Sequence, residues 1–376
     1  MVTRVSFGSA ALVFLFALLG GPPTAWGIEF SRNLSMYACE HSIVATVHEA
    51  WSGADNLTYA LVPQGAPRPA AEQYDAIVPV PVRRIVSMAT TNIPHLTDLG
   101  AAHTLVAVDN GDYIYDEEIR QRIQGGEIRE VGRGGSVNVE RIIALNPDVV
   151  LITVFGPDDP LQRQLQQAGI PTLIVADWRE ATPLGRAEWV KLFAALLGRS
   201  TQGDQLFQER RDRYIHLQES VAQALHNGAL QAPRIMANAP WQGQWPVPGG
   251  DSYMARLFAD AGGDYIWRDT EGAGSLFLDF EAVVSRALDA DVWLHLNVDW
   301  FSRDDIRRAD QRLTAFAPYQ NNNIFHYTRR VRRSGANDFW ERGLAQPDQI
   351  LADLVWILHG PEKAGIDEPY FYNRVQ

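Results

Sequence analysis

Two distant stretches of the chain follow the same pattern. Residues 137–151 read Val-Asn-Val-Glu-Arg-Ile-Ile-Ala-Leu-Asn-Pro-Asp-Val-Val-Leu, and residues 278–294 repeat the plan with Leu-Asp-Phe-Glu-Ala-Val-Val and then Ala-Asp-Val-Trp-Leu. Each copy places a glutamate, Glu140 or Glu281, in the first turn of a short apolar helix that leads into a buried strand headed by aspartate. A repeat of this kind predicts two lobes of the same design.

Short apolar strands alternate with helical segments in both halves of the chain. In residues 83–182 we expect strands at 84–88, 104–108, 149–154 and 172–175, with helices beginning near Asn92, Asp116, Val139 and Asp159. In residues 228–376 we expect strands at 234–237, 292–296 and 324–327, and a closing helix from Pro347 to His359. This alternation predicts two similar α/β lobes with largely parallel sheets.

A helical stretch at residues 183–227 separates the two lobes and predicts a long interlobe helix. Gly198 and Gly203 are the points at which it could break or kink. Before the first lobe, residues 28–82 predict a small N-terminal strand module, with β-formers at 43–47 and 57–62, followed by a proline-rich linker from Pro63 to Pro81. We expect this module to pack on the first lobe.

The first 27 residues have the pattern of a cleavable signal peptide. A charged start at Arg4 precedes an apolar run over residues 10–19 and the small-residue site Ala25-Trp26-Gly27, so we expect a periplasmic mature chain that begins near Ile28. A lipid anchor would need a cysteine directly after the apolar run, and Cys39 lies well past it. Because Cys39 is the only cysteine, it has no internal disulfide partner, and we expect it to be buried.

Charge and motifs disfavour several classes of function. A net charge of −12 argues against nucleic acid as a partner, although local basic loops could still bind an anionic ligand. The sequence has no G-x-S-x-G elbow and no phosphate-binding G-x-x-x-x-G-K-[ST] loop, and its histidines are scattered, so we expect no catalytic residues and no metal site. A metal-dependent enzyme or metallochaperone on a similar two-lobed fold is the alternative, which clustered histidine or carboxylate ligands would favour.

Candidate ligand-binding residues follow the strands of the first lobe. Loops at the carboxyl ends of parallel strands meet at one edge of a sheet, where ligands bind. The candidates at this edge are Thr91, Asn92, Asn110, Tyr113, Phe155, Trp178 and Arg179. Helix capping is the alternative role for Thr91 and Asn92.

The second lobe contributes aromatic and basic candidates. Trp241 and Trp245 stand in a loop rich in glycine and proline, and Trp300 follows the strand at 292–296, so each could contact a ligand. Arg329 opens the run Arg329-Arg330-Val331-Arg332-Arg333, which could hold an anionic ligand at the cleft mouth. A solvated surface is the alternative for this run.

Several of these segments together resemble the periplasmic binding proteins with a rigid interlobe helix, the group that includes cobalamin-, siderophore- and haem-binding receptors. The resemblance covers residues 83–376 and rests on residues 84–87, 138–148 and 261–264 and on Glu281, with a subgroup similarity at 182–189 and 337–343. It implies a monomeric, non-enzymatic substrate-binding protein without a cofactor of its own. Its cargo would be a ferric siderophore, a corrinoid or haem, and the residues leave this choice open.

The same resemblance implies the partner of the protein. The cargo would pass to the permease dimer of an ABC importer, and the protein would meet the membrane only through that permease. Glu140 and Glu281 would then dock onto permease arginines. The alternative is that each glutamate simply stabilises the N-terminus of its helix.

Overall fold

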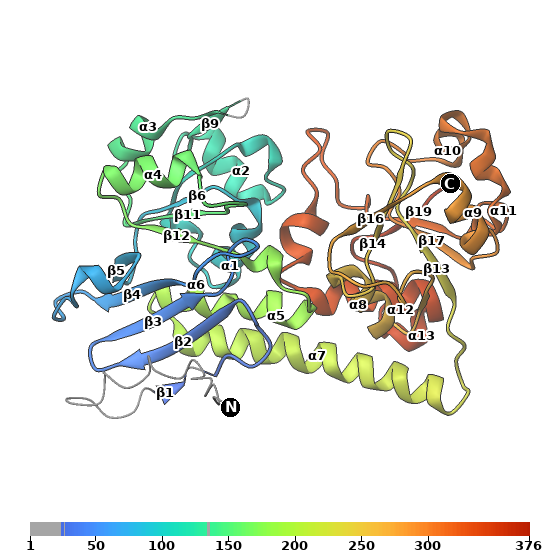
Figure 1. The fold of residues 1–376 in the computed structure, drawn as a ribbon, viewed down its shortest axis with the longest axis horizontal. Coiled ribbons are helices and arrows are strands. Elements are labelled where there is room, and N and C mark those ends of the chain that lie inside the picture. Colours follow the sequence, from blue (N-terminus) through green and yellow to red (C-terminus); the bar gives the residue numbers. More distant parts are fainter. Residues whose placement is uncertain (1–23, 26, 134–135) are drawn as a thin grey trace, which may run out of the picture.

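The computed structural model describes residues 24–25, 27–133 and 136–376. The predicted signal peptide, residues 1–27, therefore falls almost entirely outside the described residues. Two α/β lobes lie side by side, and a long helix runs beneath both of them (Figure 1). A separate β-sheet near the N-terminus lies below the first lobe.

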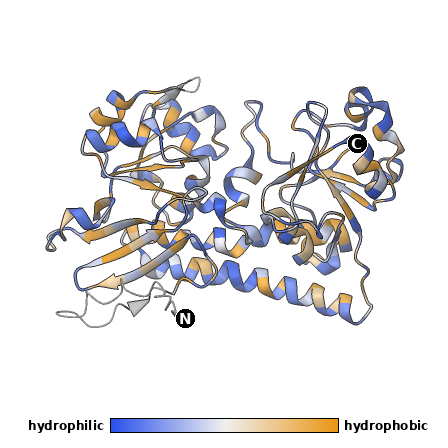
Figure 2. Ribbon diagram, viewed as in Figure 1, coloured by the Kyte–Doolittle hydropathy of each residue, from blue (hydrophilic) through white to orange (hydrophobic). Residues whose placement is uncertain are grey.

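Each lobe is built around a five-stranded sheet. The first sheet has the order β12-β11-β6-β7-β8, formed by Thr172–Ile174, Val149–Ile152, Ile85–Ser87, Leu105–Val108 and Arg129–Glu130. The second has the order β15-β13-β17-β18-β19, formed by Asp264–Tyr265, Arg234–Ala237, Val292–Leu294, Ile324–His326 and Asn373–Arg374. All pairings in these two sheets are parallel except that of β19, and the inner strands are hydrophobic and buried (Figure 2).

The two sheets confirm the repeat. The strands β12, β11, β6 and β7 correspond in order to β18, β17, β13 and β15, and both β11 and β17 follow a glutamate-bearing helix. The aspartate that heads this strand has the same role in both lobes. Asp148 accepts hydrogen bonds from the backbone N–H groups of Arg83 and Arg84 at 2.6 and 2.9 Å, and Asp291 accepts one from Arg234 at 2.7 Å.

Helices cover both sheets. The first lobe contains α1 (Ile93–Asp98), α2 (Glu117–Gln124), α3 (Val139–Ala144) and α4 (Pro160–Gln167). The second contains α8 (Tyr253–Asp260), α9 (Phe280–Ala287), α10 (Arg303–Ala309), α11 (Ala317–Gln320), α12 (Pro347–His359) and α13 (Pro361–Ala364). Many begin at a side chain that caps the first turn, such as Asp116, Asn138, Asp159, Ser252 and Asp279, and this capping explains the predicted starts near Asp116, Val139 and Asp159.

The expected single helix at 183–227 is three helices. These are α5 (Pro183–Glu188), α6 (Val190–Leu196) and α7 (Ser200–His226), and only α7 spans both lobes. The break before α7 is at Gly198, whose φ of +66° lies in the left-handed region that ends a helix. Gly203 does not break α7. A Cβ there would lie 2.3 Å from the Cβ of Ala194, so this glycine lets α6 and α7 pack closely.

The N-terminal module packs on the first lobe as expected. Its sheet runs β1-β2-β3-β4-β5, formed by Thr24–Ala25, Leu34–Cys39, Ser42–Val47, Leu57–Pro63 and Ala76–Val80, and its buried side chains share one core with the first lobe. The expected linker at 63–81 was wrong in part, because β5 joins the sheet parallel to β4. Cys39 is exposed rather than buried, because it lies at the tip of the hairpin that joins β2 to β3.

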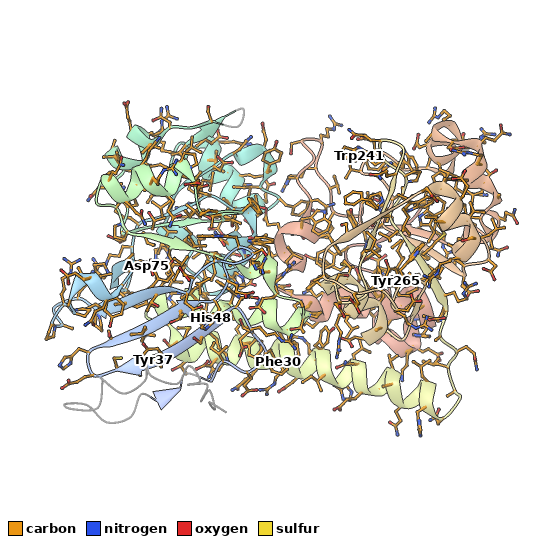
Figure 3. All side chains as sticks on the ribbon, in the orientation of Figure 1. Phe30, Tyr37, His48, Asp75, Trp241 and Tyr265 are labelled. Carbon is orange, nitrogen blue, oxygen red and sulfur yellow. The ribbon has the colours of Figure 1, made fainter. Side chains whose placement is uncertain are left out.

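Two buried carboxylates hold the backbone of residues 29–33 against the segment between the lobes. Glu188 of α5 accepts the backbone N–H groups of Glu29, Phe30 and Ser31 at 2.8–3.1 Å and pairs with Lys191 at 2.9 Å. Glu180 accepts the next backbone N–H groups and Nε1 of Trp189. The ring of Phe30 lies 5.8 Å from that of Phe207 in α7 (Figure 3). Because donors surround both carboxylates, they can remain buried.

A second connection between the lobes is the segment at residues 337–343, called the interlobe clasp below. It includes a π-helical turn (Phe339–Gly343) that lies between the lobes (Figure 1). Buried Glu341 accepts the backbone N–H groups of Tyr115 and Asp116 in the first lobe at 2.6 and 2.9 Å. Arg342 pairs with Asp98 and Asp116, each at 3.3 Å.

The clasp predicts a pH dependence of stability. Burial raises the pKa of Glu341 from 4.5 to about 7, against the opposing effect of its two backbone hydrogen bonds. The folded chain therefore binds this proton more tightly than the unfolded chain, so the contribution is complete below about pH 4.5 and is lost as the pH rises through about 7. We expect Glu341→Gln to reduce the fall in unfolding free energy between about pH 5 and 7 by roughly 1–3 kcal/mol.

The measurement is urea unfolding at several pH values. The control is Glu118→Gln, which removes an exposed carboxylate on α2. An unchanged pH dependence in Glu341→Gln would show that this carboxyl is already ionised in the folded protein.

Candidate ligand-binding cleft

The carboxyl ends of the first-lobe strands surround a cavity of about 470 Å³. Residues that follow β6, β7, β11 and β12 line it, because parallel strands end at the same edge. Five of the candidates from the sequence meet here: Thr91, Asn110, Tyr113, Phe155 and Trp178. The rule on strand ends therefore located the lining of this cavity.

The aromatic side chains of this cavity are strongly exposed. Phe155 is 77% exposed and Tyr113 is 61% exposed. The rings of Phe155 and Trp178 lie 5.1 Å apart and form a continuous apolar wall. Large aromatic surfaces left open to water on loops are typical of sites that contact a ligand.

A second cavity of about 690 Å³ lies between the lobes. Its lining comes from both sides: Trp178, Arg179, Glu180 and Arg186 before and in α5, and Asn238, Trp241, Tyr253, His295, Trp300, Tyr327 and Trp340 from the second lobe. Trp241 is 58% exposed on its loop at the upper part of the second lobe (Figure 3). Trp178 borders both cavities, so they are adjacent, and the two together are called the cleft below.

The floor of the second cavity contains two strained polar residues. Asn238 follows β13 and His295 follows β17, and both have a φ of +61°. Nε2 of His295 lies 2.6 Å from the hydroxyl of Tyr372. Burial, with a smaller effect of His326, lowers the pKa of His295 to about 3, so its imidazole is neutral. Backbone strain of this kind clusters at ligand-binding positions.

Three candidates from the sequence do not line the cleft, which corrects the expectation. Trp245 is 0% exposed, because it begins β14 (Trp245–Pro248), which pairs with β16 (Ser275–Leu278), and its Nε1 donates to the carbonyl of Ala237 at 3.1 Å. Asn92 is buried and donates to Ser87 at 3.0 Å, beneath the cavity rather than in it. Arg329 lines neither cavity and pairs with Glu368 at 2.5 Å.

Two further arginines of the basic run, Arg330 and Arg332, are also engaged elsewhere. Arg330 pairs with Asp338 at 2.6 Å, and Arg332 pairs with Glu117 of the first lobe at 2.6 Å. The guanidinium of Arg332 also donates to the carbonyl of Tyr115 at 2.7 Å. Arg332 therefore reinforces the contact between the lobes beside the clasp, and Arg330 adds to it because its guanidinium lies over the ring of Tyr115 at 5.1 Å.

Several residues of the cleft were not predicted from the sequence. Asp109, Asp177, Asn238, His295 and Tyr327 line it, and each comes directly or within a few positions after a strand of a parallel sheet. Asn110 and Trp178 were predicted because they follow the carboxyl ends of parallel strands. The same rule applies to these five residues. Tyr253 and Trp340 give no such signal, because α8 and the clasp bring them to the cleft.

The two matched glutamates occupy equivalent places. Glu140 lies in the first turn of α3 and Glu281 in that of α9, and both are exposed. Asn138 and Asp279 cap these turns through the N–H groups of Arg141 and Ala282. Since the capping side chains already satisfy these donors, the glutamates are not needed for that purpose.

Metal-binding groups do not converge in the described part of the chain. No group of three or more histidine, cysteine, aspartate or glutamate side chains there is placed to hold a metal ion. Among the described helices, none is both long and apolar enough to cross a membrane.

These features define a class, a two-lobed ligand-binding protein with an aromatic cleft between α/β lobes. The chain belongs to the periplasmic binding protein family, whose sequence profile matches residues 85–331. A related lipoprotein of Methanocaldococcus jannaschii, described as uncharacterised, is 27% identical over 293 residues, which are 75% of this chain and 66% of that protein. The matched region thus spans just under two thirds of that relative.

Two further similarities bear on the family. An uncharacterised ABC transporter substrate-binding lipoprotein of Bacillus subtilis is 26% identical over 154 residues, 40% of this chain and 46% of that protein. A periplasmic haem-binding protein from Pseudomonas aeruginosa has a TM-score of 0.54 and 20% identity, covering 74% of this chain and 93% of its own. At this identity the similarity of structure shows the fold alone, and it confirms the expected two-lobed architecture.

The two neighbouring tryptophans give a matched test of the site. We expect Trp241→Ala to weaken ligand binding by about 1–3 kcal/mol without loss of fold, because it removes one exposed stacking ring. Trp245→Ala should instead lower the unfolding free energy by about 3–5 kcal/mol, because it opens a cavity in the core. Calorimetric titration and urea unfolding of both variants check this, and wild-type affinity in Trp241→Ala would remove that loop from the site.

Proposed function

We propose that this protein captures a metal chelate, such as a ferric siderophore, a corrinoid or haem, and delivers it to an ABC importer. In this proposal the chelate lies in the cleft between the lobes, and the protein itself is not an enzyme. It acts outside the cytoplasmic membrane, in line with the lipoprotein and periplasmic descriptions of its relatives.

The observation on which the proposal rests is the aromatic cleft. Trp178 joins two cavities of about 470 and 690 Å³, and Tyr113, Phe155, Trp241 and Trp300 line the same cleft. Pockets for drug-sized ligands measure about 300–1,000 Å³, and each of the two adjacent cavities lies within this range, so the cleft has room for a ligand with flat apolar faces. Rings of a macrocycle or of a chelating group stack on such surfaces.

The relatives support this class of ligand. The structurally similar protein from Pseudomonas aeruginosa is described as haem-binding, and the similar Bacillus subtilis protein as an ABC transporter substrate-binding lipoprotein. The scattered metal-binding side chains of the described residues favour a chelated metal over a bare ion.

A tryptophan-fluorescence titration tests the cargo class. The chain has 11 tryptophans, and Trp178, Trp241, Trp300 and Trp340 line the cleft, so a bound chelate should quench emission strongly. A saturating chelate should also raise the melting temperature. If ferric siderophores, haem and corrinoids all left fluorescence and melting temperature unchanged at micromolar concentration, this cargo class would be wrong.

Docking to the permease is proposed through Glu140 and Glu281. Two equivalent exposed carboxylates, one on each lobe, suit a permease dimer that presents the same basic loop twice. Charge complementarity of this kind fixes orientation and speeds encounter. Figure 1 shows α3 and α9 on the sides of their lobes away from α7.

The double variant Glu140→Ala with Glu281→Ala should bind chelate normally and lose stimulation of ATP hydrolysis by the cognate importer in proteoliposomes. Glu209→Ala with Glu219→Ala is the matched control, because it removes two exposed carboxylates from α7 and changes the net charge equally. Normal stimulation in the first pair, or loss of chelate binding, would contradict the docking assignment.

A further inference from the structure

The cleft has few cationic groups for a ligand. Among the described residues that line the two cavities, the only arginines or lysines are Arg179 and Arg186. Arg186 donates to the carbonyls of Asp177 and Trp178 at 3.0 and 2.8 Å and lies over the ring of Tyr253. Arg179 pairs with Glu49 at 3.5 Å and lies over the ring of Trp178. The guanidinium of Arg186 thus already has hydrogen-bond partners, and that of Arg179 has Glu49 and the Trp178 ring beside it, while its buried Nε has no hydrogen-bond partner among the described residues.

Acidic groups are more numerous on the same surface. Asp109 and Asp177 line the first cavity, and exposed Asp299 lines the second. Glu180 also borders the second cavity, but backbone donors of the N-terminal segment and the indole of Trp189 surround its carboxylate. The lining of the cleft therefore has the same sign as the net charge of the whole chain.

Asp109 is the acidic group best placed to meet a ligand. It follows β7, is half-buried, and its carboxylate has no hydrogen bond or ion pair within the described part of the chain. Gly132 makes room for it, since a Cβ there would lie 1.6 Å from Oδ1 of Asp109. The backbone N–H of Gly132 also donates to the carbonyl of Asp109 at 2.8 Å, which fixes the position of the residue.

The cost of burying the carboxylates of Asp109 and Asp177 depends on the charge of the ligand beside them. Burial raises the pKa of Asp109, and it raises the pKa of Asp177 as well. A cation or a hydrogen-bond donor near these groups would relieve that cost, whereas an added anion would increase it. Binding sites for multiply charged anions instead present free arginine or lysine side chains.

We propose that the cleft selects an uncharged or cationic chelate with outward hydrogen-bond donors, such as amide or amine groups, over an anionic one, and that Asp109 is a specificity-determining residue. This inference rests on the proposed function and narrows its ligand class. In this proposal, stacking on the aromatic rings accounts for most of the binding affinity. The acidic residues of the lining account for the difference in affinity between chelates of different charge.

A panel of chelates that differ in charge tests the inference. We expect uncharged cyanocobalamin or cationic ferrioxamine B to bind the full chain at least about tenfold more tightly than anionic ferric enterobactin or haemin, whose propionates are ionised. Equal or tighter binding of either anionic probe would overturn the inference and leave the proposed function standing. If none of the probes bound, both this inference and the proposed function would be wrong.

The variant Asp109→Asn tests whether this residue causes the preference for a cationic chelate. Asp109→Asn should weaken ferrioxamine B binding about fivefold or more at low salt, and Asp158→Asn, which removes an exposed carboxylate outside both cavities, should leave it within about twofold. The affinity of the wild-type chain for this cation should also fall as sodium chloride is added. An Asp109→Asn variant that folds and binds like the wild type, or a salt-independent affinity, would overturn the role of Asp109.

Discussion

The carboxylate of Glu341 is buried where the second lobe meets the first, and it accepts two backbone N–H groups from the segment that leads into α2. A buried carboxylate is tolerated only when donors surround it, so this contact fixes the relative position of the two segments. Arg342 strengthens it through Asp98 and Asp116. With the clasp on one side and α7 beneath, the lobes have two rigid connections, and the cleft that they enclose has a defined width.

The chemistry of the cleft follows from this arrangement. Trp178 belongs to the first side and Trp241 to the second, so a ligand that contacts both must lie between the lobes. The arginines beside them bind backbone carbonyls, aromatic rings and Glu49, and thereby support the walls. An aromatic surface with few basic groups favours ligands that stack on its rings and donate hydrogen bonds to its acceptors.

The N-terminal module contributes to the same wall. Glu180 borders the cleft and, with Glu188, holds residues 29–33 of the segment that leads into β2. The module shares its core with the first lobe, and its Glu49 pairs with Arg179 of the cleft at 3.5 Å. Residues 29–33, all of which the structure describes, line neither cavity, yet a change in them would affect the cleft through Glu180.

Local sequence patterns predict the repeat, seven of the ten strands in the two lobe sheets, the bounds of α12 and the starts of α2, α3 and α4, because apolar periodicity and capping are local properties. They also predict five residues of the first cavity, although Asp109 and Asp177 at the same strand ends were missed. Tertiary packing determines that Trp241 is exposed while Trp245 is buried, that Asn92 lies beneath the cavity, and that Arg329 is paired with Glu368. The reason is that the burial and partners of a side chain depend on elements distant in sequence, such as β16 for Trp245, which no local pattern contains.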